Sequence, residues 1–222
     1  MIGLLGYFAI CLLETGSTVL KLSQVLTRSF GLLAQHPLGI VWLLTQALLV
    51  SVFTLGLLAG PMQVGIYTVL MRYARTGEWR PEALWGNTTG HNIATGIVFV
   101  ASALAAFVVG LPFTVPNAAL ASVLGFVGLF AINLLWFYTF QIMVDDDQVW
   151  PNAMRKGWDL MQQGGLGNHL LLIAILESLV LVSTLSTWIA FQVAMYLLLL
   201  GFSTVARAVA YVQLVPTRAF EP

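Results

Sequence analysis

One carboxylate lies within an otherwise apolar segment of the sequence. Glu177 belongs to the run LGNHLLLIAILESLVLVSTLSTW, which covers residues 166–188, and it follows His169 by eight residues. That separation corresponds to about 12 Å of helical rise, so Glu177 would lie near the middle of a membrane-spanning helix. Acids at this depth usually face a bundle interior and are candidates for proton transfer or solute contact. We expect Glu177 to be a protonated or hydrogen-bonded packing residue, with a role in transport as the alternative.

Few polar groups accompany Glu177 in the apolar segments. The neutral ones are Gln46, Asn133, Gln141 and Gln192. A transporter normally contains several ionisable groups in its interior, and Arg207 is the basic candidate on the next apolar run. Equal distances from the intervening turn place Arg207 nearer the inner membrane surface than Glu177. We therefore expect the two not to pair directly unless the helix is tilted or the turn is shifted. Glu177, Asn133, Gln192 and Arg207 are the intramembrane polar candidates.

The three histidines stand at similar places along the chain. His36, His91 and His169 each precede the first helix of a predicted helical hairpin. Neutral imidazole is a good axial ligand, so these residues could hold haem or chlorophyll. An amphipathic ring is equally comfortable at a membrane interface, and three such positions need not converge. We expect no cofactor, with a haem- or chlorophyll-binding subunit as the lesser alternative.

Three consecutive aspartates, Asp145 to Asp147, suggest a cation site because carboxylates suit hard cations. However, they lack the alternating spacing, the glycine and the closing glutamate of an EF-hand loop. We expect them to cap the helix that begins near Trp150 and to favour its positive N-terminal end. No metal site is predicted.

Motifs of the common enzyme classes are missing from the sequence. It contains no HExxH, no GxSxG, no Gly-rich phosphate loop and no close Cys and His arrangement. The single cysteine, Cys11, excludes an internal disulfide. We therefore predict that the chain is not an enzyme.

Composition indicates a membrane protein. Charged residues make up 8% of the 222 positions and apolar residues 59%, whereas soluble domains contain roughly 25% and 45–50%. The formal net charge is zero, and no block of Lys or Arg could attract a polyanion, so nucleic acid is not an expected partner.

The apolar windows predict an all-α polytopic bundle of about six spans. They fall at residues 38–59, 60–74, 93–111, 118–143, 169–187 and 189–211. The window 60–74 is short for a span. With six spans and both termini in the cytoplasm, all nine basic residues lie on or near the inner face, as the positive-inside rule requires. The spans then form three hairpins with short, uncharged outer turns.

A single membrane domain over residues 1–222 accounts for this pattern. Residues 1–35 are expected to form an interfacial, amphipathic segment, residues 36–212 the hairpins, and residues 213–222 a cytoplasmic tail. Amphipathic helices are also expected along the membrane surface before the hairpins. Gly56 and Gly60 form a GxxxG pair, which favours close helix packing.

Three short stretches resemble a known group of membrane proteins. They are GPMQVG at residues 60–65, RTGEW at 75–79 and VDDDQVWPNAMRKGW at 144–158. With the Pro-containing outer turn, they resemble bacterial six-helix proteins related to the membrane domain attached to some glycerophosphodiester phosphodiesterases. The resemblance implies a helical bundle in the bacterial cytoplasmic (inner) membrane. The phosphodiesterase catalytic domain has no counterpart here, so no catalytic residue is carried over.

These observations favour a non-catalytic membrane subunit that contacts lipids, a larger membrane complex or further copies of itself. The aromatic run LLWFYTF at residues 134–140 is expected to face lipid or a partner. The alternative is a small transporter or permease component that uses Glu177 in its interior.

Overall fold

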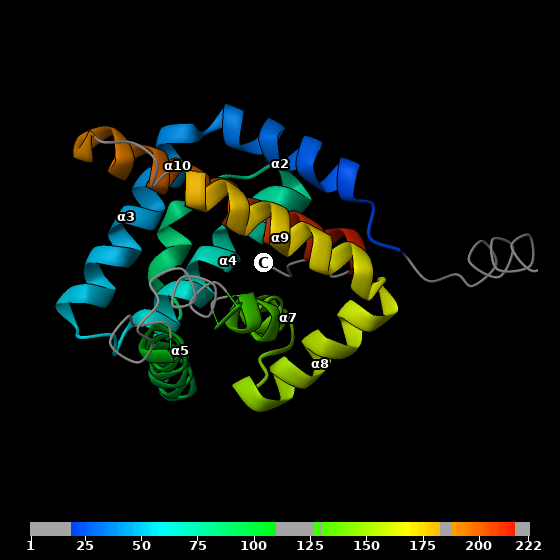
Figure 1. The fold of residues 1–222 in the computed structure, drawn as a ribbon. Coiled ribbons are helices and arrows are strands. Elements are labelled where there is room, and N and C mark those ends of the chain that lie inside the picture. The colour runs from blue at the N-terminus through cyan, green and yellow to red at the C-terminus, as the bar shows by residue number, and fades with distance from the viewer. Residues whose placement is uncertain (1–18, 110–126, 129, 183–187, 216–222) are drawn as a thin grey trace, which may run out of the picture.

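The computed structural model describes residues 19–109, 127–128, 130–182 and 188–215. This part of the chain is helical and has no strand, which confirms the all-α fold class. Its α-helices are α2 (Leu22–Gln35), α3 (Pro37–Phe53), α4 (Ala59–Thr76), α5 (Gly90–Val109), α7 (Thr139–Asp146), α8 (Trp150–Gln163), α9 (Leu166–Val182) and α10 (Ile189–Leu214), and the 3-10 helix η1 covers Pro81–Trp85 (Figure 1).

Several predictions fall on residues outside this part of the chain. Of the N-terminal segment 1–35 and the tail 213–222, residues 1–18 and 216–222 are not among the described residues. The same holds for the predicted outer turn between residues 111 and 118. These predictions therefore stay untested.

Helix α4 lies at the centre of the fold. It packs against α3, α5, η1, α7 and α10, and 13 of its 18 residues are buried. The sequence window 60–74 was short for a span, but the helix continues to Thr76 and ends at Gly77, whose φ of 76° suits glycine. The helix is therefore surrounded by protein on most sides.

Close packing of α4 on α5 depends on two glycines from different helices. A Cβ atom at Gly60 would overlap the backbone of Gly96, and a Cβ at Gly96 would overlap the backbone of Gly60. Only hydrogen fits at either position, so the two backbones touch. The predicted partner within the chain, Gly56, lies instead in the turn before α4 with a φ of 85°. Gly60 thus serves helix packing as expected, but with Gly96 across the interface.

The aromatic side chains of the run at residues 134–140 are buried, so their predicted exposure to lipid or a partner was wrong, whereas Leu135 of the same run is 48% exposed. Trp136, Phe137, Tyr138 and Phe140 are each at most 3% exposed. A turn at residues 136–138 separates the preceding helical residues from α7. The run therefore does not form one outward helical stripe. Its rings stack within the core, with the centroids of Trp136 and Phe140 5.3 Å apart.

One helix among the described residues is long and apolar enough to cross a membrane alone. It is α10, which has 26 residues. Helices α2 and α3 meet the same criterion only when taken together, and they are bent by 90° at their junction. A membrane location is thus supported weakly by one or two helices, and the six-span arrangement stays a prediction.

Candidate functional site

A partly buried polar cluster centres on Arg207, in the second half of α10. Its Nη2 donates hydrogen bonds to Oδ1 of Asn133 at 2.8 Å and to Oε1 of Glu177 at 3.2 Å. The side chains of Arg207 and Glu177 are 17% and 16% exposed. Three segments of the chain therefore meet at one guanidinium group, and three of the four polar residues predicted from sequence come together.

The ion pair between Arg207 and Glu177 contradicts our expectation that they would not pair directly. Glu177 lies five residues before the end of α9, and Arg207 lies 18 residues after the start of α10. These separations correspond to about 8 Å and about 27 Å of helix. The first turns of α10 extend past the end of α9, as Figure 1 shows, so the middle of α10 lies beside Glu177.

Tyr67 and Gln141 extend this cluster toward α4 and α7. The hydroxyl of Tyr67 lies near the side chains of both Arg207 and Gln141. Within the described part of the chain, the buried amide nitrogen and oxygen of Gln141 have no hydrogen-bond partner, and neither does Nε of Arg207. Because buried polar groups are normally hydrogen-bonded, the cluster retains capacity to bind a small polar molecule. The sequence signal for Tyr67 was only a hydroxyl in an apolar window.

Gln192 lies away from the cluster. It precedes Arg207 by 15 residues on α10, which corresponds to about 22 Å along the helix. The four polar candidates therefore do not line one common site.

His169 is buried and both of its ring nitrogens are engaged. Nδ1 lies 2.9 Å from the carbonyl oxygen of Gly165, and Nε2 lies 2.8 Å from the hydroxyl of Tyr138. A carbonyl oxygen only accepts, so Nδ1 donates and Nε2 accepts from Tyr138. This arrangement leaves no nitrogen lone pair for a metal or tetrapyrrole. His169 instead joins the start of α9 to the turn before α7.

The other two histidines have different neighbours. His36 stacks on Trp79, with ring centroids 5.4 Å apart, and meets Tyr73 edge-on. His91 lies 3.6 Å from the exposed carboxylate of Asp147. The three histidines thus belong to separate clusters, and no group of three or more His, Cys, Asp or Glu among the described residues could hold a metal ion.

Asp145 forms a buried, bidentate ion pair with Arg75. Two nitrogens of the guanidinium group donate to the two carboxylate oxygens at 2.8 and 2.6 Å, and the two side chains are 7% and 3% exposed. The same guanidinium donates to the carbonyl oxygen of Val215. Arg75 therefore connects the ends of α4, α7 and α10.

The predicted capping role of the three aspartates was wrong. Val149 occupies the N-cap of α8 and makes no capping hydrogen bond from its side chain. Asp145 and Asp146 lie in the last turn of α7, where Asp146 pairs with Lys156 at 3.0 Å. Asp147 ends that helix with a φ of 49° and is exposed. Helix α7 thus ends at Asp146, three residues before the N-cap of α8, and the aspartates belong to the end of α7 instead of the start of α8.

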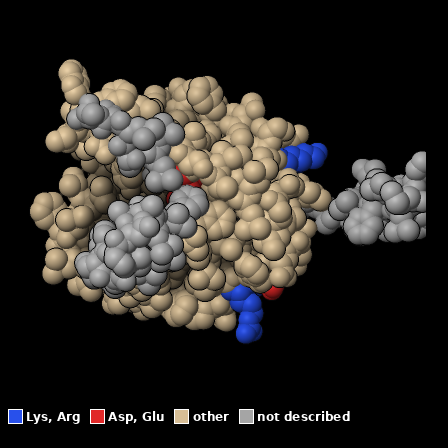
Figure 2. Space-filling view, in the orientation of Figure 1, with Lys and Arg blue, Asp and Glu red and all other residues tan. Residues whose placement is uncertain are grey.

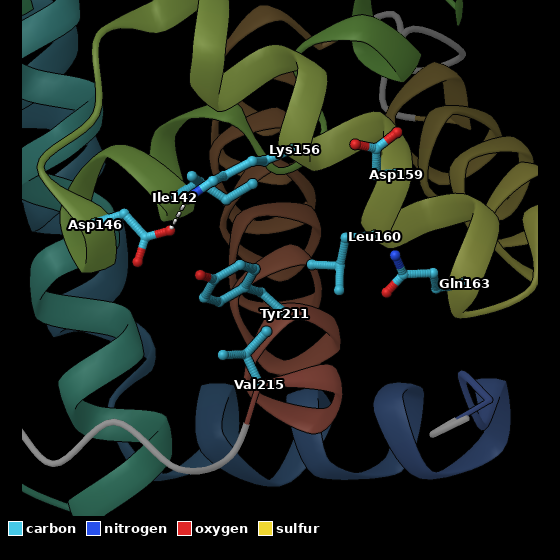
Figure 3. Close-up of a pocket in the computed structure, with 8 residues that line it drawn as sticks. All are labelled: Ile142, Asp146, Lys156, Asp159, Leu160, Gln163, Tyr211 and Val215. Atoms are coloured by element: carbon cyan, nitrogen blue, oxygen red, sulfur yellow. Dashed lines mark hydrogen bonds and ion pairs between the residues drawn. The ribbon is translucent and has the colours of Figure 1, made fainter. Parts of the chain in front are cut away.

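A pocket opens where α7, α8 and the end of α10 meet, and sequence reasoning missed it. Its volume is about 280 Å³. Its lining residues are Ile142, Asp146, Lys156, Asp159, Leu160, Gln163, Tyr211 and Val215 (Figure 3). The charged face of α8 was the available signal, but only the packing of α8 against α7 and α10 turns that face into a pocket.

Comparison of the chain with protein-family models, curated proteins and solved structures gives no match. The resemblance to the membrane domain of glycerophosphodiester phosphodiesterases therefore stays a prediction.

Proposed function

We propose that the chain is a non-catalytic integral membrane protein, a structural subunit whose apolar outer surface contacts lipids and neighbouring membrane proteins. Large apolar side chains exposed on α3 and the start of α10 carry this proposal. They include Leu38, Trp42, Val52, Phe53, Trp188, Ile189, Phe191 and Val193, each more than half exposed. Helices α3 and α10 pack against each other, and extensive exposed apolar surface marks a membrane or protein contact in folded proteins.

The distribution of charged residues also supports a membrane or protein contact at the exposed apolar surface of α3 and α10. No charged residue occurs between Arg28 and Arg72 or between Glu177 and Arg207, and these stretches contain α3 and the first half of α10. Most of the described surface visible in Figure 2 is uncharged, with Lys and Arg near its edges. A water-exposed surface would usually carry charged residues at roughly a quarter of its positions or more.

The proposed location is the bacterial cytoplasmic membrane, with six spans and both termini in the cytoplasm. The positive-inside rule favours this orientation for the basic residues. Burial of α4 is compatible with a central position in such a bundle, where neighbouring helices rather than lipid cover its surface.

The Arg207 cluster fits a structural role within that bundle. Glu177 is neutralised by Arg207, and Asn133 takes a second hydrogen bond from the same nitrogen. Paired polar groups of this type join helices in an apolar environment. Glu177 is accordingly assigned to helix packing.

One observation favours a transporter or permease component as the second candidate. The side-chain amide of Gln141 is buried beside Tyr67 and lacks hydrogen-bond partners within the described residues. A polar solute passing through the bundle could use this group. Solute flux in vesicles is the readout that separates the two candidates.

Membrane extraction tests the proposed function. Full-length protein should stay in the membrane pellet after alkaline carbonate and leave it only with detergent. Gentle detergent extraction followed by size separation, mass spectrometry and visible absorption should then reveal stoichiometric protein partners. Release by carbonate would overturn the membrane assignment, whereas detergent-dependent release without any partner would overturn the subunit assignment.

A further inference from the structure

The pocket between α7, α8 and α10 combines an apolar base with a charged rim. Ile142 and Tyr211 are buried at 3% and 2% exposure and form part of the base, with Leu160 and Val215 beside them. Figure 3 shows Asp146 and Lys156 on one side of Tyr211, and Leu160 and Gln163 on the other. Such a combination suits a small ligand that has both a charged group and carbon atoms.

The charges of the lining residues favour a cation. The lining residues include two carboxylates, Asp146 and Asp159, and one ammonium group, that of Lys156. Lys156 already pairs with Asp146 at 3.0 Å, whereas Asp159 has no ion pair within the described part of the chain. The rim therefore carries one carboxylate in excess, which attracts cations and repels anions.

The apolar base favours an organic cation over a bare metal ion. Ca²⁺ requires six to eight oxygen ligands, and Mg²⁺ requires an octahedral set. No set of three or more His, Cys, Asp or Glu among the described residues could hold a metal. Leu160 and Val215 offer no oxygen ligands to a metal ion. They can, however, contact the carbon atoms next to an ammonium group.

We propose that this pocket binds a primary alkylammonium group. The carboxylate of Asp159 accepts hydrogen bonds from the N–H groups of the ligand. The side-chain oxygen of Gln163 supplies a further acceptor, and Leu160 contacts the adjoining carbons. Two sources share this chemistry: the ethanolamine headgroup of a phospholipid and a free amine. The lipid source rests on the proposed membrane location, in which the amphipathic α8 lies at the depth of the headgroups.

Binding to the purified full-length protein tests the proposal. Protein delipidated in detergent is titrated with phosphatidylethanolamine, phosphatidylglycerol or free ethanolamine, and binding is followed by native mass spectrometry and thermal shift. We expect an ethanolamine-bearing ligand to bind at least tenfold more tightly than phosphatidylglycerol. Asp159→Asn should weaken that binding by roughly tenfold, because a charge-assisted hydrogen bond is lost.

Asp147→Asn provides the matched control. Asp147 has a 91% exposed side chain, lies outside the pocket and has a positive φ that asparagine tolerates. Its replacement should leave binding unchanged. Equal affinity for phosphatidylethanolamine and phosphatidylglycerol, or unchanged binding in Asp159→Asn, would overturn the proposal.

The ligand comparison also separates the two sources. Binding of phosphatidylethanolamine without binding of free ethanolamine identifies the lipid, and binding of free ethanolamine that depends on Asp159 identifies soluble amines as ligands. If free ethanolamine binds in this way and carbonate also releases the protein from membranes, the proposed ligand of the pocket would be supported. The proposed membrane function would be contradicted. The two proposals can therefore fail separately.

Discussion

The guanidinium group of Arg207 lies 3.2 Å from the carboxylate of Glu177 and joins α10 to α9. The same nitrogen binds Asn133, so the helical residues before α7 are held at the same point. In a low-dielectric bundle this arrangement neutralises both charges and gives the acid a structural partner.

Replacement of Glu177 tests the role of this ion pair. Glu177→Gln keeps an oxygen that can accept from Arg207, so we expect a loss of about 1 kcal/mol in the free energy of unfolding. Glu177→Leu removes the acceptor as well as the counter-charge of Arg207, and should lose about 3 kcal/mol. Unfolding of the purified protein in detergent measures both values.

Gln192→Leu is a suitable control because Gln192 lies about 22 Å along α10 from Arg207. Its effect should be small. A Glu177→Gln variant that is as stable as the wild type but loses a measured solute flux would favour the transport alternative.

The pair Arg75–Asp145 is predicted to be the most sensitive ionic contact to single replacement. Both side chains are nearly fully buried, so Arg75→Met leaves a buried carboxylate without its partner and should lose about 3–5 kcal/mol. The double variant Arg75→Met/Asp145→Leu should recover part of this loss because no lone charge remains. Lys156→Met breaks a pair whose lysine is 53% exposed, and it should change stability by less than about 1 kcal/mol. Similar losses of stability for Arg75→Met and Lys156→Met would contradict the prediction that the Arg75–Asp145 pair is the more sensitive one.

Helix packing at Gly60 gives a prediction with a matched helical control. A Cβ at Gly60 overlaps the backbone of α5, so Gly60→Ala must separate α4 from α5 and should lose about 2–3 kcal/mol. Gly31 lies within α2 with nothing within 4 Å of its added Cβ. Gly31→Ala should therefore raise the free energy of unfolding by about 0.5–1 kcal/mol. Thermal unfolding in detergent checks the opposite signs, and a neutral Gly60→Ala would show that the two helices can move apart freely.

Apolar periodicity predicted the helices well. It did not predict where the chain turns or how neighbouring helices are offset along their axes. The run at residues 134–140 contains neither proline nor glycine, so no local signal marks the turn at residues 136–138, where its buried aromatic residues begin. Hydropathy also treats lipid-facing and core-facing rings alike. The pairing of Arg207 with Glu177 depends on the offset between α9 and α10, which comes from tertiary packing. The sequence identified Asn133 as a polar residue within an apolar run, but only the structure identifies Arg207 as its hydrogen-bond partner.

The six-span arrangement makes a specific prediction for the two ends of α4. Leu55, in the turn before this helix, is 91% exposed, and Thr76 is exposed at its C-terminal end. The 18 residues of α4 extend about 27 Å, which approaches the roughly 30 Å of the hydrocarbon core. In a Cys11→Ala background, a membrane-impermeant maleimide should label Leu55→Cys from outside intact cells. It should label Thr76→Cys only after the membrane is permeabilised. Labelling of both positions from the same side would show that α4 does not cross the membrane, and would leave the bundle with an odd number of spans.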